Sequence, residues 1–170
     1  STSGSIGGTA PTTSILNLLG TTTWAGTAAT VVSVSTNVGI QVNAGLTIST
    51  AGRLSAGYLQ INPGGFIGGT NPVVYPTNGT LVYNHTSGTY GVGVNEFPAT
   101  TGPSNLIINA NGSSTGISFA NNNIGARTLA GTLTLNQNLV LSGSGPAALT
   151  TLNTTANATS TVSGTGTYTQ

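Results

Sequence analysis

Apolar residues recur at every second position in several short runs of the chain. Val38, Ile40 and Val42 form one run, and shorter runs lie at residues 46–48 and 59–61. Each run is followed by a stretch that contains Asn, Gly or Pro, at residues 43–45, 51–52 and 62–65. A period of two indicates strands, and these residue types favour turns. The pattern therefore predicts short β-strands that are joined by tight corners.

A faint internal repeat has the same form. Residues 45–48 (Gly-Leu-Thr-Ile) resemble residues 58–61 (Tyr-Leu-Gln-Ile), thirteen positions later, and residues 132–141 run as strand, polar corner and strand. Asn78-Gly79 and Asn111-Gly112 lie between strand candidates, and this residue pair suits tight turns with positive φ. The repeat indicates a chain built from recurring units of strand and corner.

The chain divides into a short arm and one domain. Residues 1–14 are rich in Ser, Thr and Gly, and we predict that they form a flexible arm or a donor strand that becomes ordered on a partner. Residues 15–170 are expected to form a single β domain, because no clear boundary divides them. Within this domain, residues 64–76 are richer in Gly and Pro and are expected to form an extended loop.

The composition agrees with an all-β fold. Charged residues make up 2% of the 170 positions, against about 25% in typical globular proteins. Lys is absent and Glu occurs once, whereas Thr, Ser, Asn and Gly are abundant. These abundant residues are poor helix formers, and Thr and Val favour the pleated surface of a strand.

Two all-β architectures fit short strands with frequent polar corners. A parallel β-solenoid (β-helix), in which each coil turns two or three corners and stacks on the next, is favoured; an antiparallel β-sandwich of the donor-strand type is the alternative. In a solenoid, uncharged Asn, Ser and Thr stack in ladders, and Asn ladders add hydrogen bonds. Like charges stacked in a column would repel one another, so the near-absence of charge favours the solenoid.

The formal net charge of +1 excludes several classes of partner. Two arginines cannot form the basic stripe that binds nucleic acid, and attraction to an anionic membrane surface fails for the same reason. The longest early apolar cluster, residues 15–19, is far shorter than the roughly 20 residues that span a bilayer, so we expect no membrane insertion. The chain begins at Ser1 and contains no Met, and we expect a processed product whose targeting segment has been removed.

Few side chains are available for catalysis or metal binding. General acid–base chemistry would depend on His85 and Glu96, in a Ser–His–Glu arrangement. We expect instead a surface His in the turn at residues 84–88 and a Glu at the start of a linker, and hence no enzyme. One His and no Cys cannot build a tetrahedral zinc site, and calcium-binding β-rolls use Asp, which is absent. No metal and no cofactor are expected.

The few charged residues are candidate subunit contacts, because a chain with so little charge is expected to retain it where it serves a contact. These residues are Arg53, Glu96 and Arg127, and Glu96 is a candidate ion-pair partner of either arginine. Trp24, near the start of the β region, is a candidate hydrophobic cap or subunit contact. Tyr168, in a C-terminal run of alternating Thr residues, is the fifth candidate contact.

Five acceptor sequons for N-glycosylation begin at Asn78, Asn84, Asn111, Asn153 and Asn157. Each is a candidate site in a suitable secretory system. A chain this rich in Asn, Ser and Thr also forms sequons by chance.

Residues 79–141 resemble a recurring segment of large secreted cell-surface proteins of Bacteroidota and their relatives. The resemblance rests on residues 79–84 (Gly-Thr-Leu-Val-Tyr-Asn), residues 95–108 (Asn-Glu-Phe-Pro-Ala-Thr-Thr-Gly-Pro-Ser-Asn-Leu-Ile-Ile) and residues 128–135 (Thr-Leu-Ala-Gly-Thr-Leu-Thr-Leu). It implies a β-helical repeat that is exported by the type IX secretion route. Members of that family usually carry some Lys and Asp and a C-terminal sorting domain, which are not seen in this sequence.

Together these observations predict an extracellular or cell-surface structural protein. We expect a self-assembling subunit of a filament or stalk, in which identical subunits form a homopolymer through end-to-end β contacts. The alternative is an adhesin or carbohydrate-binding surface module, in which Tyr and Asn on one face of a solenoid bind a glycan.

Overall fold

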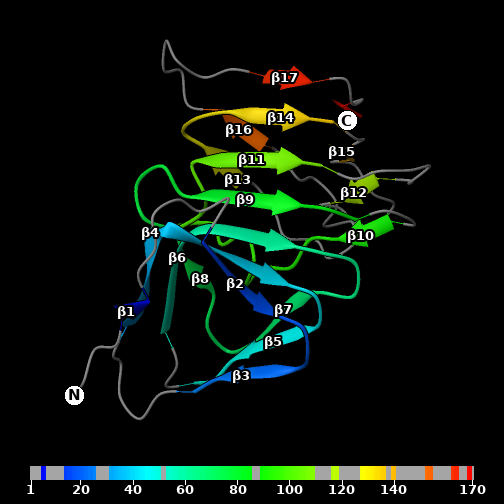
Figure 1. The fold of residues 1–170 in the computed structure, drawn as a ribbon. Helices are drawn as coiled ribbons and strands as arrows, with labels where there is room; N and C mark the ends of the chain where they lie inside the picture. The colour runs from blue at the N-terminus through cyan, green and yellow to red at the C-terminus, as the bar shows by residue number, and fades with distance from the viewer. Residues whose placement is uncertain are drawn as a thin grey trace.

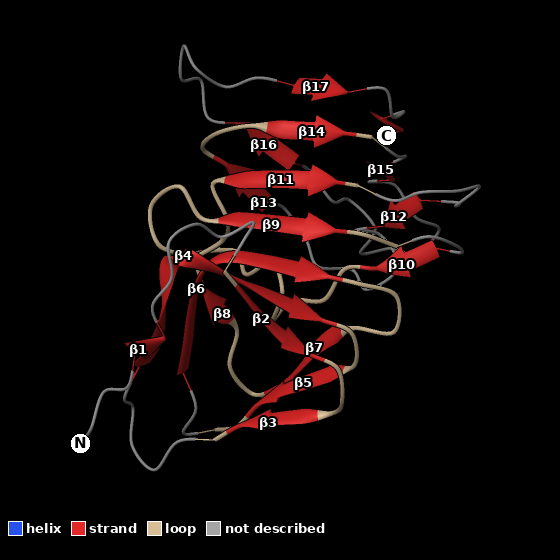
Figure 2. Ribbon diagram, in the orientation of Figure 1, coloured by secondary structure: helices blue, strands red, loops and turns tan. Residues whose placement is uncertain are grey.

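The computed structural model describes residues 5–6, 14–25, 31–50, 53–85, 89–109, 116–118, 127–136, 139–140, 152–154, 162–164 and 168–169. This part of the chain consists of strands and loops without a helix (Figure 2). The strands are β1 (Ser5–Ile6), β2 (Ile15–Leu18), β3 (Thr22–Trp24), β4 (Val31–Val42), β5 (Gly45–Ile48), β6 (Arg53–Ile61), β7 (Phe66–Gly69), β8 (Val73–Val74), β9 (Thr80–Tyr83), β10 (Thr89–Gly91), β11 (Asn105–Ile108), β12 (Gly116–Ser118), β13 (Arg127–Leu129), β14 (Leu133–Leu135), β15 (Leu139–Val140), β16 (Leu152–Thr154), β17 (Val162–Gly164) and β18 (Tyr168–Thr169).

Every strand pairing among the described residues is parallel. The strands stack coil upon coil into a β-solenoid (Figure 1). The predicted all-β solenoid is therefore confirmed, and the antiparallel sandwich is wrong. The physical reason is that strands consecutive in sequence do not pair with each other, and each strand pairs instead with a strand of the neighbouring coil.

Three sheets matter for the position of the candidate sites. The long sheet runs through β2, β4, β6, β9, β11, β14 and β17 and forms the front of the view in Figure 1. The lower side sheet consists of β3, β5 and β7, and the upper side sheet of β10, β12, β15 and β18. Each coil of the chain leaves the long sheet and continues into one of the side sheets.

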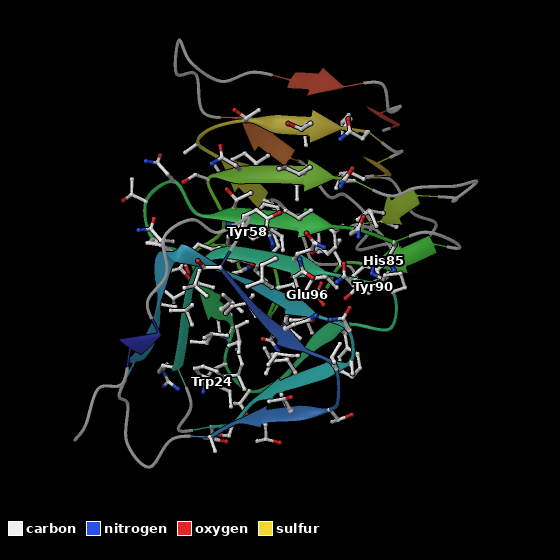
Figure 3. The ribbon with its side chains drawn as sticks, viewed as in Figure 1. Trp24, Tyr58, His85, Tyr90 and Glu96 are labelled. Carbon is white, nitrogen blue, oxygen red and sulfur yellow. The ribbon has the colours of Figure 1, made fainter. Side chains whose placement is uncertain are left out.

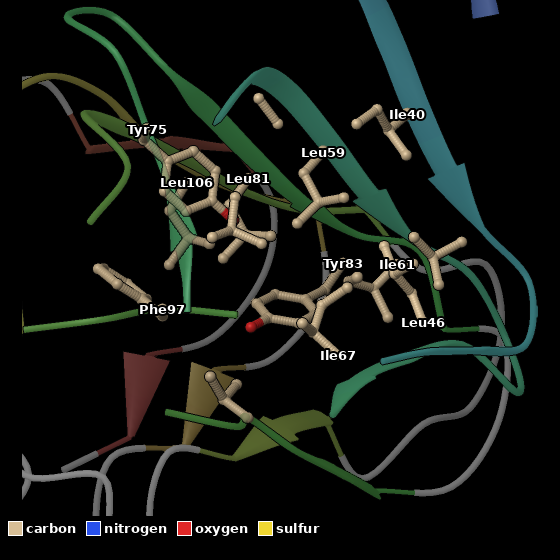
Figure 4. Packing of buried hydrophobic residues seen from close by; sticks show 14 of the residues in the cluster. Ile40, Leu46, Leu59, Ile61, Ile67, Tyr75, Leu81, Tyr83, Phe97 and Leu106 are labelled. Carbon is tan, nitrogen blue, oxygen red and sulfur yellow. The ribbon is translucent and has the colours of Figure 1, made fainter. Parts of the chain in front are cut away.

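The core is a set of aliphatic columns inside the coils. Ile40, Leu59, Leu81 and Leu106 lie in register on successive strands of the long sheet and are fully buried (Figure 4). Gln41 and Gln60, the next residues along β4 and β6, point to the opposite face of the sheet, which is the alternation that the sequence displays there. At about 25 cal/mol for each Å² of apolar surface buried, such columns supply most of the stabilisation of the fold.

The thirteen-residue repeat compares strands of different sheets. Leu46 of β5 pairs with Ile67 in the lower side sheet, whereas Leu59 of β6 pairs with Ile40 in the long sheet. The structural counterpart of a strand lies a whole coil away, because each coil contains more than one strand. The two strands of the repeat at residues 132–141 are present as β14 and β15, and residues 137–138 between them lie outside the described residues.

The extended loop expected at residues 64–76 is wrong, because this segment contains β7 and β8. The segment packs closely on the coil below it. The ring of Phe66 lies over Gly45 of the neighbouring strand, and a Cβ on Gly45 would lie 2.7 Å from the Phe66 Cζ. Gly69 adopts a φ of 98°, where the strand ends. The turn expected at Asn78-Gly79 is present, with a φ of 65° at Asn78.

A column of asparagines follows the long sheet at the corner where each strand ends. The Asn62 side chain donates to Oδ1 of Asn43 at 2.9 Å, and Asn84 donates to Oδ1 of Asn62 at 3.1 Å. Higher in the stack, Asn136 donates to Oδ1 of Asn109 at 3.4 Å. The backbone N–H of each of these residues also donates to the strand below, as from Asn62 to the Val42 carbonyl at 2.9 Å. The column thus fixes the corner of successive coils in one register.

Removing a central member of this column should be costly. Asn62 is 8% exposed and also accepts from Nε2 of Gln60 at 2.8 Å. We expect Asn62→Ala to lower the free energy of unfolding by roughly 2–3 kcal/mol, because its partners lose their hydrogen bonds while they remain partly buried. Urea unfolding measures the change. Asn136→Ala is the matched control, since Asn136 is exposed and makes one longer side-chain bond; it should cost less than about 1 kcal/mol. An equal loss of unfolding free energy in both variants would show that the central hydrogen bonds of the column stabilise the fold no more than the exposed one.

Candidate functional site

The side of the solenoid is interrupted where the lower and upper side sheets meet. Among the described residues, β7 pairs only with β5, and β10 pairs only with β12. The segment at residues 92–103 lies at this break, and Glu96, which is 1% exposed, lies within it (Figure 3). The only acidic side chain of the protein is therefore inside the fold.

Four donors surround the Glu96 carboxylate. Oε1 accepts from the backbone N–H of Ile67 in β7 at 3.0 Å and from the hydroxyl of Tyr90 in β10. Oε2 accepts from the hydroxyl of Tyr83 and from the backbone N–H of Gly93, each at 3.1 Å. A carboxylate has about four acceptor positions, so its capacity is filled. Neither arginine is among these donors. The carboxylate thereby joins the two side sheets to the long sheet.

The rest of the segment takes the place of a strand. Nδ2 of Asn95 donates to the Gly69 carbonyl at the end of β7 at 2.9 Å, and the Asn95 carbonyl accepts from the N–H of Val73 in β8 at 2.9 Å. The hydroxyl of Tyr75 donates to the Glu96 carbonyl at 2.7 Å. Strand edges that a regular coil would cover are covered here by side chains and single backbone groups.

Burial dominates the titration of this cluster. Burial raises the pKa of Glu96, although the hydrogen bonds from Tyr90, Ile67, Gly93 and Tyr83 act in the opposite direction. Burial also raises the pKa of Tyr83 and of Tyr90, and the nearby Glu96 carboxylate raises both further. A cluster of groups that favour their neutral forms is what removal from water produces.

His85 lies beside this cluster. Its ring stacks on Tyr90 with centroids 4.1 Å apart, and burial lowers its pKa. The buried Nε2 finds no hydrogen-bond partner among the described residues. The expected surface position of His85 is wrong, because its side chain is buried. Glu96 does lie in a connecting segment, between β10 and β11, but its side chain is also buried, and Tyr90 contacts both side chains. The sequence does not indicate that His85 and Glu96 are close, because β10 separates them along the chain.

The chemistry open to these groups is limited. The acceptor positions of Glu96 are occupied by four donors, which leaves none for a substrate proton. In the part of the chain that the structure describes, no three His, Cys, Asp or Glu side chains gather to hold a metal ion. The cluster can hold the coils together, and this is the role its geometry supports.

The remaining candidate contacts lie apart from one another. Nε1 of Trp24 donates to the Arg53 carbonyl at 3.1 Å, and Nη1 of Arg53 donates to the Thr50 carbonyl at 3.1 Å. Arg127 is buried, and its Nε donates to the Phe97 carbonyl at 2.5 Å. Tyr168 belongs to β18, which pairs with β15. The structure thus brings Trp24 together with the backbone of Arg53, and does not gather the five candidates at one surface.

The candidate glycosylation sites differ in their surroundings. Asn78 is exposed at a turn, whereas Nδ2 of Asn84, the atom that would carry a glycan, donates within the asparagine column. Asn153 is part of β16. Asn111 and Asn157 lie outside the described residues.

The lower edge of the solenoid is a second candidate site, formed by β2 and β3. In the described part of the chain each of these strands pairs on one side only, with β4 and β5 respectively. The Ser14 carbonyl accepts from the N–H of Gly39 in β4, and the Leu18 carbonyl accepts from the N–H of Asn43, which follows β4. Because alternate residues of a strand turn their backbone groups to opposite sides, Ile15 and Asn17 turn theirs toward the lower edge.

Apolar side chains are exposed at this edge. Ile15 is 43% exposed and Leu19 is 75% exposed. Leu19 follows β2 at the position where the next coil has Asn43, so the asparagine column stops there. Sequence reasoning treated residues 15–19 only as too short to span a membrane and did not identify them as an edge. The same reasoning placed residues 1–14 in an arm, and Ser5–Ile6 of that arm pairs with β4 of the same chain.

Comparisons with protein-family profiles, with curated proteins and with solved structures give no match for this chain. No helix in the described residues is long and apolar enough to cross a bilayer. The resemblance to secreted surface proteins stays a prediction.

The raised pKa of Glu96 gives a pH dependence with a definite sign. The carboxyl titrates near 4.5 when unfolded and at a higher pH when folded, so between these values the folded state binds more protons and stability falls as the pH rises. We expect the free energy of unfolding of the unmodified chain, minus that of Glu96→Gln, to be largest below pH 4.5 and to shrink as the pH rises above it.

Urea unfolding at a series of pH values measures this difference. His85 and the tyrosines titrate in both proteins, so their direct contributions largely cancel. A difference that stays constant from about pH 4 to about pH 8 would show that the carboxyl titrates as it does in the unfolded chain.

Proposed function

We propose that this protein is an extracellular structural subunit that assembles end to end, each copy continuing the parallel sheet of the next. The observation that carries the proposal is the lower edge. There β2 and β3 direct backbone groups away from the solenoid. A row of such groups is a template for another strand.

In the described residues, the edge lacks the features by which proteins usually prevent such pairing. Natural edge strands are blunted by Lys, by Pro or by a covering element. Neither β2 nor β3 contains a charged residue or a Pro, and Ile15 and Leu19 are exposed beside them. Burial of these two side chains against a second copy would favour association, at about 25 cal/mol for each Å² of apolar surface removed from water.

The charge distribution also supports assembly of identical copies. The formal net charge is +1, so repulsion between copies is small. Glu96 and Arg127 are buried, which leaves little charge to oppose contact between surfaces. We include assembly outside the cell in this proposal. Glycan binding, the alternative function, stays a prediction.

A charge at the edge should prevent assembly. We expect the unmodified chain to form regular filaments above a critical concentration, seen by negative-stain electron microscopy. Ile15→Lys should remain dispersed, because stacking would desolvate the ammonium group in the contact. Val94→Lys is the matched control, since Val94 is 54% exposed and lies in the segment at residues 92–103, far along the stack from β2. Dispersed monomers of the unmodified chain at high concentration would refute the proposal.

A further inference from the structure

We propose that the subunits stack head to tail and that the side-chain amide of Asn17, which accepts from the lowest residue of the asparagine column, donates a hydrogen bond to the next copy. This inference rests on the proposed assembly. It adds the polarity of the stack and the group that determines it.

Parallel pairing makes the two ends of the solenoid different. Within each sheet the described strands run in one direction, so a copy that continues the sheet with the same direction must place its upper end against the lower edge of its neighbour. Two lower edges that met across a two-fold axis would pair their strands antiparallel instead. A contact between unlike ends repeats without closing and yields a filament.

The asparagine column has a direction of its own. In each side-chain link, the NH₂ group of the later residue donates to the carbonyl oxygen of the earlier one: Asn136 to Asn109, Asn84 to Asn62, and Asn62 to Asn43. The lowest link follows the same rule, because Nδ2 of Asn43 donates to Oδ1 of Asn17 at 2.5 Å. The links therefore share one direction, and the lowest of them ends on Asn17, whose amide NH₂ group is a donor.

Asn17 supplies that donor. Its Oδ1 faces Asn43 in the coil above, and the planar amide therefore turns its NH₂ group away from that coil. The side chain is exposed, and its NH₂ group has no partner among the described residues. The backbone groups of Asn17 also face the lower edge. One residue thus presents a side-chain donor and a strand edge to the copy below.

The sharpest test removes the donor alone. Asn17→Asp keeps an oxygen that accepts from Asn43 and replaces the NH₂ group with a second oxygen, which cannot donate at neutral pH. Gln41→Glu is the matched control, because Gln41 pairs with Asn17 in register one coil above the edge and undergoes the same change from amide to carboxylate. Sedimentation of each polymer at a series of protein concentrations gives the critical concentration, and thermal unfolding checks that each chain is folded.

We expect Asn17→Asp to raise the critical concentration about fivefold or more and Gln41→Glu to leave it within about twofold of the unmodified chain. Small amounts of Asn17→Asp mixed into the unmodified chain should shorten the polymers. The upper end of the variant is intact and still joins a growing filament, but its altered lower edge then binds the next copy more weakly. If Asn17→Asp polymerises at the same critical concentration as the unmodified chain, this inference is wrong and the proposed assembly still holds. Equal losses in both variants would also overturn it, since they would reflect charge rather than the donor. Failure of the unmodified chain to polymerise would overturn the proposed function itself.

Discussion

The constraint on which this structure depends is that parallel stacking places each residue over its counterpart in the next coil, about 4.8 Å away. Two like charges at that distance repel by about 1 kcal/mol in water and by about 3–4 kcal/mol where the effective dielectric constant is near 20. Stacked asparagines attract one another instead, because the amide of one donates a hydrogen bond to the amide of the next, as Asn62 does to Asn43. Aliphatic residues gain as well, since Leu59 packs on Ile40 and Leu81. A chain with 2% charged residues therefore suits this architecture.

Glu96 is the exception, and it lies where the stacking is interrupted. None of the strand pairings in the described part of the chain includes it, because the segment at residues 92–103 takes the place of a regular strand. The carboxylate instead bonds to groups of β7, β9 and β10. It thereby connects β7 and β10, which a continuous side sheet would have joined through backbone hydrogen bonds. A buried carboxylate carries a desolvation cost, and its filled hydrogen bonds offset part of that cost. The same side chain that interrupts the stack connects its lower and upper parts.

Alternation predicted the strands of the long sheet, because one face of each strand is buried and the other is not. The asparagine column could also have been predicted, since Ile40-Gln41-Val42-Asn43 recurs as Leu59-Gln60-Ile61-Asn62 and again at residues 81–84, 106–109 and 133–136. The Glu96 cluster could not, because two of its four donors come from positions 13 and 29 residues away in sequence, and the more distant one is a backbone N–H. The strands β7 and β8 were missed because Gly and Pro usually indicate loops, whereas here Gly45 makes room for the Phe66 ring of the next coil.

Growth through the lower edge is tested most directly by amide hydrogen exchange at the residues whose backbone faces that edge, Ile15, Asn17 and Thr23. Polymers are exposed to deuterated water, dissolved under conditions that stop exchange, and compared with dispersed protein by nuclear magnetic resonance. If each copy continues the sheet of the next, these three amides become paired and their exchange slows on the order of tenfold or more on assembly. Exchange at the same rate in both forms would contradict end-to-end pairing and place the contact on another surface.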